Sequence, residues 1–245
     1  MKIVKVPSDL GSLGRNKTKK AADAIIKKLK EYIKDFEIGS VEINEDNIDE
    51  TNRKISEKEG DIFIGGDHSI TYSCFKNFSR KYKTPGLLVF DAHADCMENF
   101  KITHEDWLRV LIEEKFVKPE NVVLVGLRNV EKNEMDYLKN KGITYFFMEN
   151  IVSMGDVCDV IMERMRVCDG FYISIDIDSV DPAFAPGTGV IEPAGFTSRE
   201  LLYFVKRLRL LKNLRRIDLV EVNPERDVSE MTVKLGARII YEFMR

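Results

Sequence analysis

Hydrophobic and polar positions alternate along the chain in a regular way. Short, mainly apolar runs recur, and longer charge-rich segments with helical spacing separate most of them. The apolar runs occupy residues 2–6, 38–43, 61–66, 87–93, 122–127, 143–148, 171–178 and 217–222. Examples of the helical segments are residues 17–34, 69–82, 131–140, 198–211 and 229–243. Strands that alternate with helices and are almost continuously apolar predict an α/β fold with a mostly parallel sheet, covered on both faces.

Polar residues gather just after four of the predicted strands. The sequences there are "GGDHS" at 65–69, "DAHAD" at 91–95, "DIDSVD" at 176–181 and "EVNP" at 221–224. In open α/β sheets, ligands bind beyond the carboxyl ends of the strands. We therefore expect these four segments to meet at one edge of the sheet and to form a site.

The side chains at this edge are those of a metal site. Spacing by two places Asp91, His93 and Asp95 on one side of the chain, and likewise Asp176 and Asp178. Packed carboxylates repel one another and take up protons unless cations balance them, and four carboxylates balance two divalent ions. The predicted ligands are His68, Asp91, His93, Asp95, Asp176 and Asp178.

The donor set also indicates which metal. Many oxygens and two imidazoles suit Mn²⁺ better than structural Zn²⁺, and paired divalent ions lower the pKa of a shared water. A single Asp at a strand end is usually a turn residue, and a single His is usually a surface or core residue. It is their gathering in acidic strand-end clusters that argues for metal.

Composition excludes several other classes of protein. The 245 residues carry no linker, so we expect a single domain over 1–245. The net charge of -3 comes without a basic tract, which argues against nucleic acid. The four cysteines form no CxxC pair and are expected to be reduced thiols. No apolar run has the length of a membrane span or a signal core, so we expect a cytoplasmic protein without a membrane partner.

Three motifs and their order resemble the ureohydrolase family, which includes arginase, agmatinase, guanidinobutyrase and formimidoylglutamase. The motifs are "GGDHS" at 65–69, "DAHAD" at 91–95 and "SIDIDSVDPAFAPGTG" at 174–189, followed by "DLVEVNP" at 218–224. The resemblance implies a three-layer α/β/α fold with about eight parallel strands and a binuclear manganese centre. One ion would be held by His68, Asp91, Asp95 and Asp176, and the other by Asp91, His93, Asp176 and Asp178.

The resemblance also implies a reaction and roles for three residues. Hydroxide would attack the carbon of a guanidinium group, and the neutral tetrahedral intermediate would collapse to urea and an amine. Asp95 would orient the hydroxide, and Glu221 would pair with the guanidinium. His104 matches the histidine that moves protons, although this chain has His104-Glu105 where the family usually has His-Gly. His104 could instead be an ordinary residue entering a helix.

The substrate is less closely indicated. Arginase typically has an asparagine two positions after the last aspartate of "DAHAD", where this chain has Met97 after Cys96. Apolar side chains there favour a substrate without the amino-acid head group, because unpaired charges are costly to bury; the alternative is that polar contacts come from elsewhere in this loop. Glu131 could face an ammonium group of agmatine or of arginine. We predict agmatine as the substrate, with arginine second and guanidinobutyrate and formimidoylglutamate open. The product putrescine could serve polyamine synthesis or simple catabolism.

Two other classes of function agree less well with these motifs. A ureohydrolase fold without catalysis would be a binding or regulatory subunit, but all six expected ligands and Glu221 are present. A zinc amidohydrolase of the deacetylase type would use a single metal with another arrangement of ligands. The family resemblance further implies a homo-oligomer, either a trimer or a hexamer.

Overall fold

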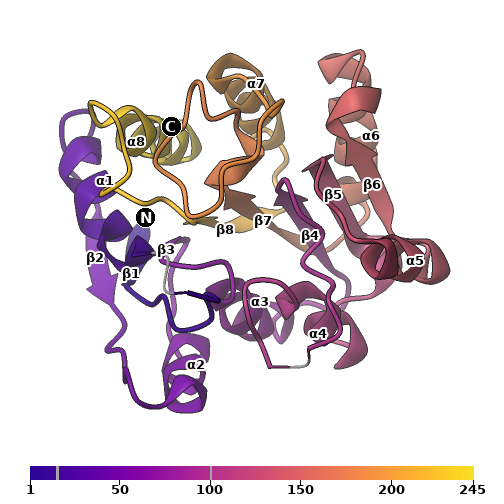
Figure 1. The fold of residues 1–245 in the computed structure, drawn as a ribbon, viewed down its shortest axis with the longest axis horizontal. Coiled ribbons are helices and arrows are strands. Elements are labelled where there is room, and N and C mark those ends of the chain that lie inside the picture. The colour runs from indigo at the N-terminus through magenta and orange to yellow at the C-terminus, as the bar shows by residue number, and fades with distance from the viewer. Residues whose placement is uncertain (15–16, 100) are drawn as a thin grey trace.

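The computed structural model describes residues 1–14, 17–99 and 101–245, and its centre is one eight-stranded sheet (Figure 1). The strands are β1 (Lys2–Val6), β2 (Glu37–Ser40), β3 (Ile62–Gly65), β4 (Pro85–Phe90), β5 (Val122–Leu127), β6 (Thr144–Phe147), β7 (Gly170–Asp176) and β8 (Leu214–Val220). Their order is β2-β1-β3-β8-β7-β4-β5-β6, and every neighbouring pair is parallel. The predicted parallel sheet of about eight strands is confirmed.

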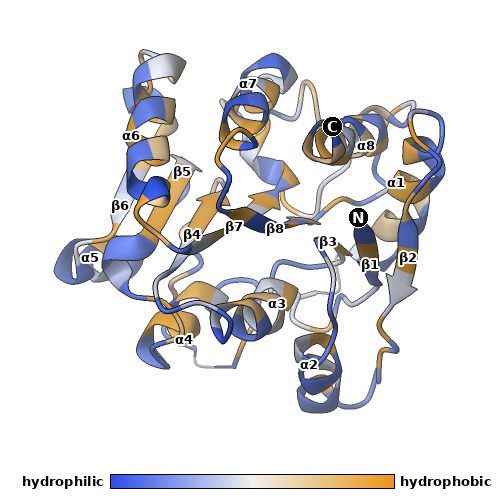
Figure 2. Cartoon of the chain, turned by 180° about the vertical axis from the view of Figure 1, so that it is seen from behind, coloured by the Kyte–Doolittle hydropathy of each residue, from blue (hydrophilic) through white to orange (hydrophobic). Residues whose placement is uncertain are grey.

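Helices cover both faces of this sheet, which confirms the three-layer α/β/α architecture (Figure 1). The helices are α1 (Ala21–Leu29), α2 (Ile48–Ser56), α3 (Ile70–Ser79), α4 (Trp107–Glu113), α5 (Lys132–Lys141), α6 (Met154–Arg166), α7 (Ser198–Leu208) and α8 (Met231–Met244). Helices α1, α6, α7 and α8 pack on one face, and α2, α3, α4 and α5 pack on the other. Figure 2 shows the apolar sides of the helices turned toward the sheet.

Alternation along the strands feeds two separate hydrophobic cores. In β4, Leu88 and Phe90 belong to the core beneath α1, α6, α7 and α8, whereas Leu87 and Val89 belong to the opposite core. All four side chains are buried, which explains the unbroken apolar run read in the sequence. The two edge strands are less buried than β4. Strand β2 is mostly exposed, and β6 is half-buried.

The five predicted helical segments each contain a helix, with shorter bounds for most of them. The segment 17–34 holds a 3-10 turn at Thr18–Lys20 followed by α1, and the segment 69–82 holds α3. Helix α7 begins where predicted because Thr197 and Glu200 form a capping box. Helices α2, α4 and α6 lie outside the five predicted segments.

The four strands that carry the polar segments are neighbours at the centre of the sheet. They are β3, β8, β7 and β4, in that order. The chain continues from β4 to β5 on one side and from β7 to β8 on the other, so the strand order reverses between β4 and β7. Such a reversal leaves a crevice at the carboxyl ends, where ligands bind in this kind of fold.

All four cysteines are buried and free, as predicted. No helix of the described residues is long and apolar enough to cross a membrane.

Candidate metal centre and substrate pocket

The turn after β3 places His68 at the centre of the site. A Cβ at Gly66 would stand 1.7 Å from the carbonyl oxygen of Ser8, so only glycine fits this turn. The Asp67 carboxylate accepts hydrogen bonds from the amides of Gly11 (3.0 Å) and Ser69 (2.9 Å), so it holds the loop in place. His68, the next residue, is almost completely buried.

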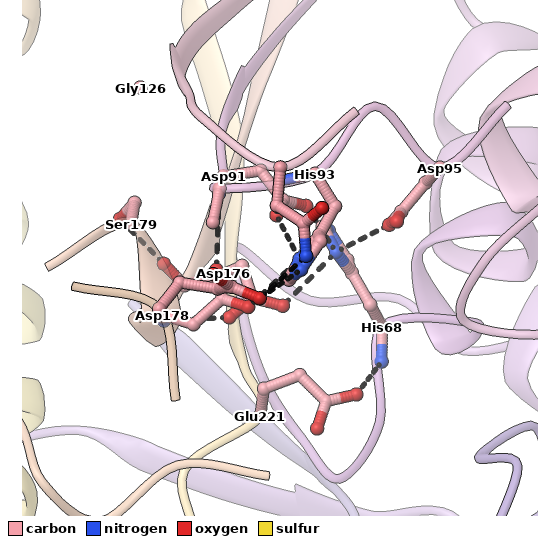
Figure 3. A network of polar contacts seen from close by, with 12 residues as sticks. His68, Asp91, His93, Asp95, Gly126, Asp176, Asp178, Ser179 and Glu221 are labelled. Atoms are coloured by element: carbon pink, nitrogen blue, oxygen red, sulfur yellow. Dashed lines mark hydrogen bonds and ion pairs between the residues drawn. The ribbon is translucent and has the colours of Figure 1, made fainter. Parts of the chain in front are cut away.

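The first group of possible ligands surrounds Nδ1 of His68. This atom lies 2.9 Å from Oδ2 of Asp91, 3.0 Å from Oδ2 of Asp95 and 3.3 Å from Oδ2 of Asp176 (Figure 3). His68, Asp91 and Asp176 form a group compact enough to hold a metal ion. Side chains from the ends of three strands therefore meet at one point, as the sequence predicted.

A second group shares Asp91 with the first. Nδ1 of His93 lies 3.1 Å from Oδ2 of Asp178 and 3.4 Å from Oδ1 of Asp91. Asp91, His93 and Asp178 form the second compact group, while Asp176 belongs to the first (Figure 3). Backbone amides orient both of its carboxylates, because the Ala92 amide donates to Asp178 and the His93 amide donates to Asp91.

Hydrogen bonding determines which nitrogen of His68 faces the carboxylates as an acceptor. Ser174 Oγ donates to Oδ1 of Asp218 (2.6 Å), so it accepts the proton of Nε2 of His68 at 2.8 Å. Nδ1 of a neutral ring then presents a lone pair to three carboxylates. Nδ1 of His68 and Oδ2 of Asp91 are buried and have no hydrogen-bond partner among the described residues. A divalent cation satisfies both atoms, so the residues present fit a metal site.

The charges of this cluster are not balanced by protein groups alone. Burial and the charge of Asp91 raise the pKa of Asp95 to about 7. Burial and the charges of Asp178 and Asp91 raise the pKa of Asp176 well above its usual value. Burial lowers the pKa of His68, but its close contacts with Asp176, Asp91 and Asp95 outweigh this effect and raise the pKa. Upward shifts of both the acids and the base are the sign of a buried anionic cluster that needs cations.

Asp95 is held in place by a tryptophan. The indole Nε1 of Trp107 donates to Oδ2 of Asp95 at 2.5 Å, and the Trp107 ring packs against the His68 ring with centroids 4.7 Å apart. Asp95 has a φ of 50° and lies in the left-handed region, as does Glu221 with a φ of 60°. Backbone strain of about 1–3 kcal/mol at such residues is typical of functional sites.

Glu221 and His104 lie together beside the aspartate and histidine cluster. Oε1 of Glu221 accepts a hydrogen bond from the His68 amide (2.9 Å) and lies 3.7 Å from Nδ1 of His104 (Figure 3 shows the Glu221–His68 contact). Oε2 of Glu221 is buried and has no hydrogen-bond partner in the described part of the chain. Nε2 of His104 accepts a hydrogen bond from the Leu13 amide (3.2 Å). His104 lies in a turn three residues before α4 begins, so it does not belong to that helix.

A pocket of about 290 Å³ opens onto the cluster. All three histidines of the chain line it, together with Asp95, Asp176, Asp178, Met97, Glu105, Asn129, Glu131, Glu134, Val190 and Glu221. The structure thus brings Met97, Glu131, His104 and Glu221 to the same cavity as the cluster. Cys96 is absent from this lining and is completely buried in a hydrophobic core.

Several residues that sequence reasoning missed support this site. Glu134 is a buried carboxylate that accepts hydrogen bonds from the amides of Cys96 (2.8 Å) and Glu131 (3.0 Å), and so joins two walls of the pocket. Arg128 donates to the carbonyl oxygens of Gly126, Asp178, Glu192 and Pro193 and fixes the loop after β7. The lone tryptophan of the chain, close after His104, was the one available signal for Trp107.

Comparisons with known proteins agree with this geometry. The model of the arginase family matches residues 1–245. An arginase of Staphylococcus aureus is 31% identical over 212 residues, covering 79% of this chain and 70% of that protein. A mitochondrial agmatinase of Gallus gallus is 34% identical over 228 residues, covering 85% and 65% respectively. The crystal structure of arginase from Bacillus subtilis superimposes with a TM-score of 0.90 at 27% identity, covering 99% of this chain and 97% of that one.

Proposed function

The chain belongs to the arginase family, and we propose that it is a manganese-dependent hydrolase that converts agmatine to putrescine and urea. The observation that carries this proposal is the charge of the pocket. Seven carboxylates line it, whereas the described lining residues include no Lys or Arg. They are Asp95, Glu105, Glu131, Glu134, Asp176, Asp178 and Glu221. Glu105, Glu131, Glu134 and Glu221 are not among the proposed metal ligands, so the pocket stays acidic when the other three bind metal. Such a pocket favours a substrate with positive charge at both ends and no carboxylate.

The six clustered residues are the proposed metal ligands. One Mn²⁺ would be held by His68, Asp91, Asp95 and Asp176, and a second by Asp91, His93, Asp176 and Asp178. Two divalent ions bound there would lower the pKa of a shared water and supply hydroxide near neutral pH. The buried lone pair on Nδ1 of His68 and the unpartnered Oδ2 of Asp91 support this assignment.

Glu221 is the proposed partner of the guanidinium group. One carboxylate oxygen is already bonded to the His68 amide, which fixes the side chain, and the other is buried without a partner in the described residues. A guanidinium group supplies N–H donors in a planar fork that suits such a carboxylate. Its binding at Glu221 places the carbon next to the metal cluster, where Asp95 would orient the attacking oxygen.

His104 is the proposed donor of the proton that the departing amine requires. Burial lowers its pKa, but Glu221, Asp95 and Asp67 outweigh this effect and raise the pKa of His104 to about 9. The Leu13 amide, in contrast, donates to Nε2 and so favours the neutral ring. Because the surroundings support both forms, the ring suits a residue that gives up and regains a proton.

Arginine is the second candidate substrate. Glu131 lines the pocket and could face an α-ammonium group, and several relatives are named arginase. The α-carboxylate of arginine, however, would enter a pocket whose described lining offers carboxylates and no basic side chain apart from histidine. The same charge argument disfavours guanidinobutyrate and formimidoylglutamate. An intact ligand set argues against a purely regulatory subunit.

Hydrolysis of a substrate panel with added Mn²⁺ tests the proposal. The panel is agmatine, arginine, guanidinobutyrate and formimidoylglutamate, with urea as the product measured, or formamide for the last. We expect agmatine to be hydrolysed fastest. If no product is released from any of the four compounds, the proposed hydrolase activity is wrong. We also propose a homo-oligomer, a trimer or hexamer, which light scattering of the purified protein would test.

A further inference from the structure

Most carboxylates that line the pocket already have partners within the protein. The Asp95 carboxylate accepts a hydrogen bond from the Trp107 indole, and the Glu134 carboxylate accepts hydrogen bonds from two backbone amides. One carboxylate oxygen of Glu221 accepts a hydrogen bond from the His68 amide. Glu131 takes part in the capping box at the start of α5. These carboxylates are therefore held by contacts that do not depend on a substrate.

Glu105 differs from these residues. Its amide donates to Thr103 Oγ1 (3.3 Å) and its carbonyl oxygen accepts from the Met97 amide (2.9 Å). Within the described chain, its carboxylate has neither a hydrogen bond nor an ion pair. This carboxylate is half-buried and lines a pocket with six others, so like charges raise its energy unless a cation is bound nearby.

The position of Glu105 indicates which end of a substrate it would meet. It follows His104, whose Nδ1 lies 3.7 Å from the buried carboxylate of Glu221. Its backbone hydrogen bond to Met97 places the two residues side by side on the pocket wall. Glu221 is buried and Glu105 only half-buried, so Glu105 lies nearer to solvent than the proposed guanidinium site.

We propose that Glu105 determines specificity by binding the terminal ammonium of a linear substrate whose guanidinium is bound at Glu221. The inference rests on the proposed function and narrows it to guanidines that carry a second cation. Met97 contributes an apolar side chain to the same wall, where the methylene chain of such a substrate would lie. A carboxylate at the end of the substrate would instead be repelled by Glu105.

The test compares two substrates that differ only in the terminal charge. The Glu105→Gln variant removes the charge at nearly constant shape. We expect its KM for agmatine to rise about 10-fold with kcat within about twofold of the unchanged protein, because a charged hydrogen bond is lost. Kinetics with butylguanidine, which lacks the ammonium group, should not change. A Glu105→Lys variant should gain activity on guanidinobutyrate, a result that misfolding cannot produce.

Glu98→Gln is the matched control. Glu98 also carries one negative charge in the loop between Asp95 and His104, but it is exposed, is ion-paired with Arg109 at 3.4 Å and does not line the pocket. We expect Glu98→Gln to leave both kinetic constants unchanged. Equal effects of the two variants, or an unchanged KM for agmatine in Glu105→Gln, would overturn the role of Glu105.

Calorimetric titration with agmatine separates this inference from the proposed function. If the unchanged protein binds agmatine without hydrolysing it and Glu105→Gln binds it about 10-fold more weakly, the proposed reaction fails and the role of Glu105 stands. If agmatine is hydrolysed and Glu105→Gln binds it equally well, the reaction stands and the role of Glu105 fails. Absence of both binding and hydrolysis overturns both.

Discussion

Ser174 Oγ lies 2.8 Å from Nε2 of His68 at the end of β7, and this contact leaves Nδ1 of His68 directed at the aspartates. The Ser174 hydroxyl donates a hydrogen bond to Asp218. The Asp218 carboxylate also accepts hydrogen bonds from the hydroxyls of Thr71 (2.8 Å) and Tyr172 (2.7 Å). A buried carboxylate with three hydroxyl donors thus sets the tautomer of a histidine that it does not touch.

Substitution of Ser174 by alanine should weaken metal binding. Without the acceptor for Nε2, the His68 ring loses its fixed tautomer and orientation, and we expect about a 10- to 100-fold loss of Mn²⁺ affinity. Calorimetry or a competing chelator measures this change. The control is Ser73→Ala, because Ser73 is equally buried but its hydroxyl has no partner in the described structure. An affinity loss of similar size in both variants would contradict the prediction.

Substitution of Asp91, which the two compact ligand groups share, should remove both ions. Asp91 belongs to both ligand groups, whereas Asp178 belongs to the second alone. We expect Asp91→Asn to retain no Mn²⁺ after dialysis and Asp178→Asn to retain about one ion per chain. Asp181→Asn should retain two, since among the described residues the Asp181 carboxylate bonds the amides of Ala183 and Ala194 alone. Two ions per chain in Asp91→Asn, measured by elemental analysis, would exclude the binuclear assignment.

Replacement of Trp107 by phenylalanine should slow catalysis more than it weakens substrate binding. Phenylalanine keeps most of the ring contact with His68 but loses the N–H that Asp95 accepts at 2.5 Å. A hydrogen bond to a charged group contributes about 1.5–3 kcal/mol, so kcat should fall at least about 10-fold. The KM for agmatine should stay within about twofold. An unchanged kcat would mean that Trp107 has only a packing role.

The metal-free protein should become less stable as the pH rises. Burial and Asp91 raise the pKa of Asp95 to about 7, so between about 4 and 7 the folded state holds more protons than the unfolded state. Stability then falls with rising pH in this range, and bound metal removes the effect. We expect Mn²⁺ to raise Tm more at pH 7.5 than at pH 5.5. Thermal unfolding with and without chelator measures the increase in Tm at each pH. A larger increase at pH 5.5 than at pH 7.5 would refute the prediction.

The strands and the gathering of aspartates and histidines were predictable because simple physical patterns produce them. A sheet covered on both faces needs continuous apolar runs, and β4 shows why, since its alternate side chains enter two different cores. Parallel strands deliver their carboxyl ends to one edge, so spacing by two was enough to gather Asp91 and Asp176 near His68. Local sequence alone carries both signals.

Contacts between loops were not predictable in the same way. Trp107 reaches Asp95 from the start of α4, and Glu134 reaches Cys96 from α5, and neither pairing leaves a periodic mark in the sequence. The two residues after "DAHAD" also have positions that the sequence did not predict. Cys96 and Met97 are adjacent and both apolar, but one enters the core and the other lines the pocket. Only the path of the backbone decides between them.

The most direct test of the account is the product balance of the manganese-loaded protein with agmatine. We predict equimolar urea and putrescine, at a kcat/KM at least about 10-fold above that for arginine, and none from Asp91→Asn. A higher kcat/KM for arginine would contradict the substrate assignment. Absence of urea from agmatine and arginine alike would contradict the central claim that this acidic pocket hydrolyses guanidines.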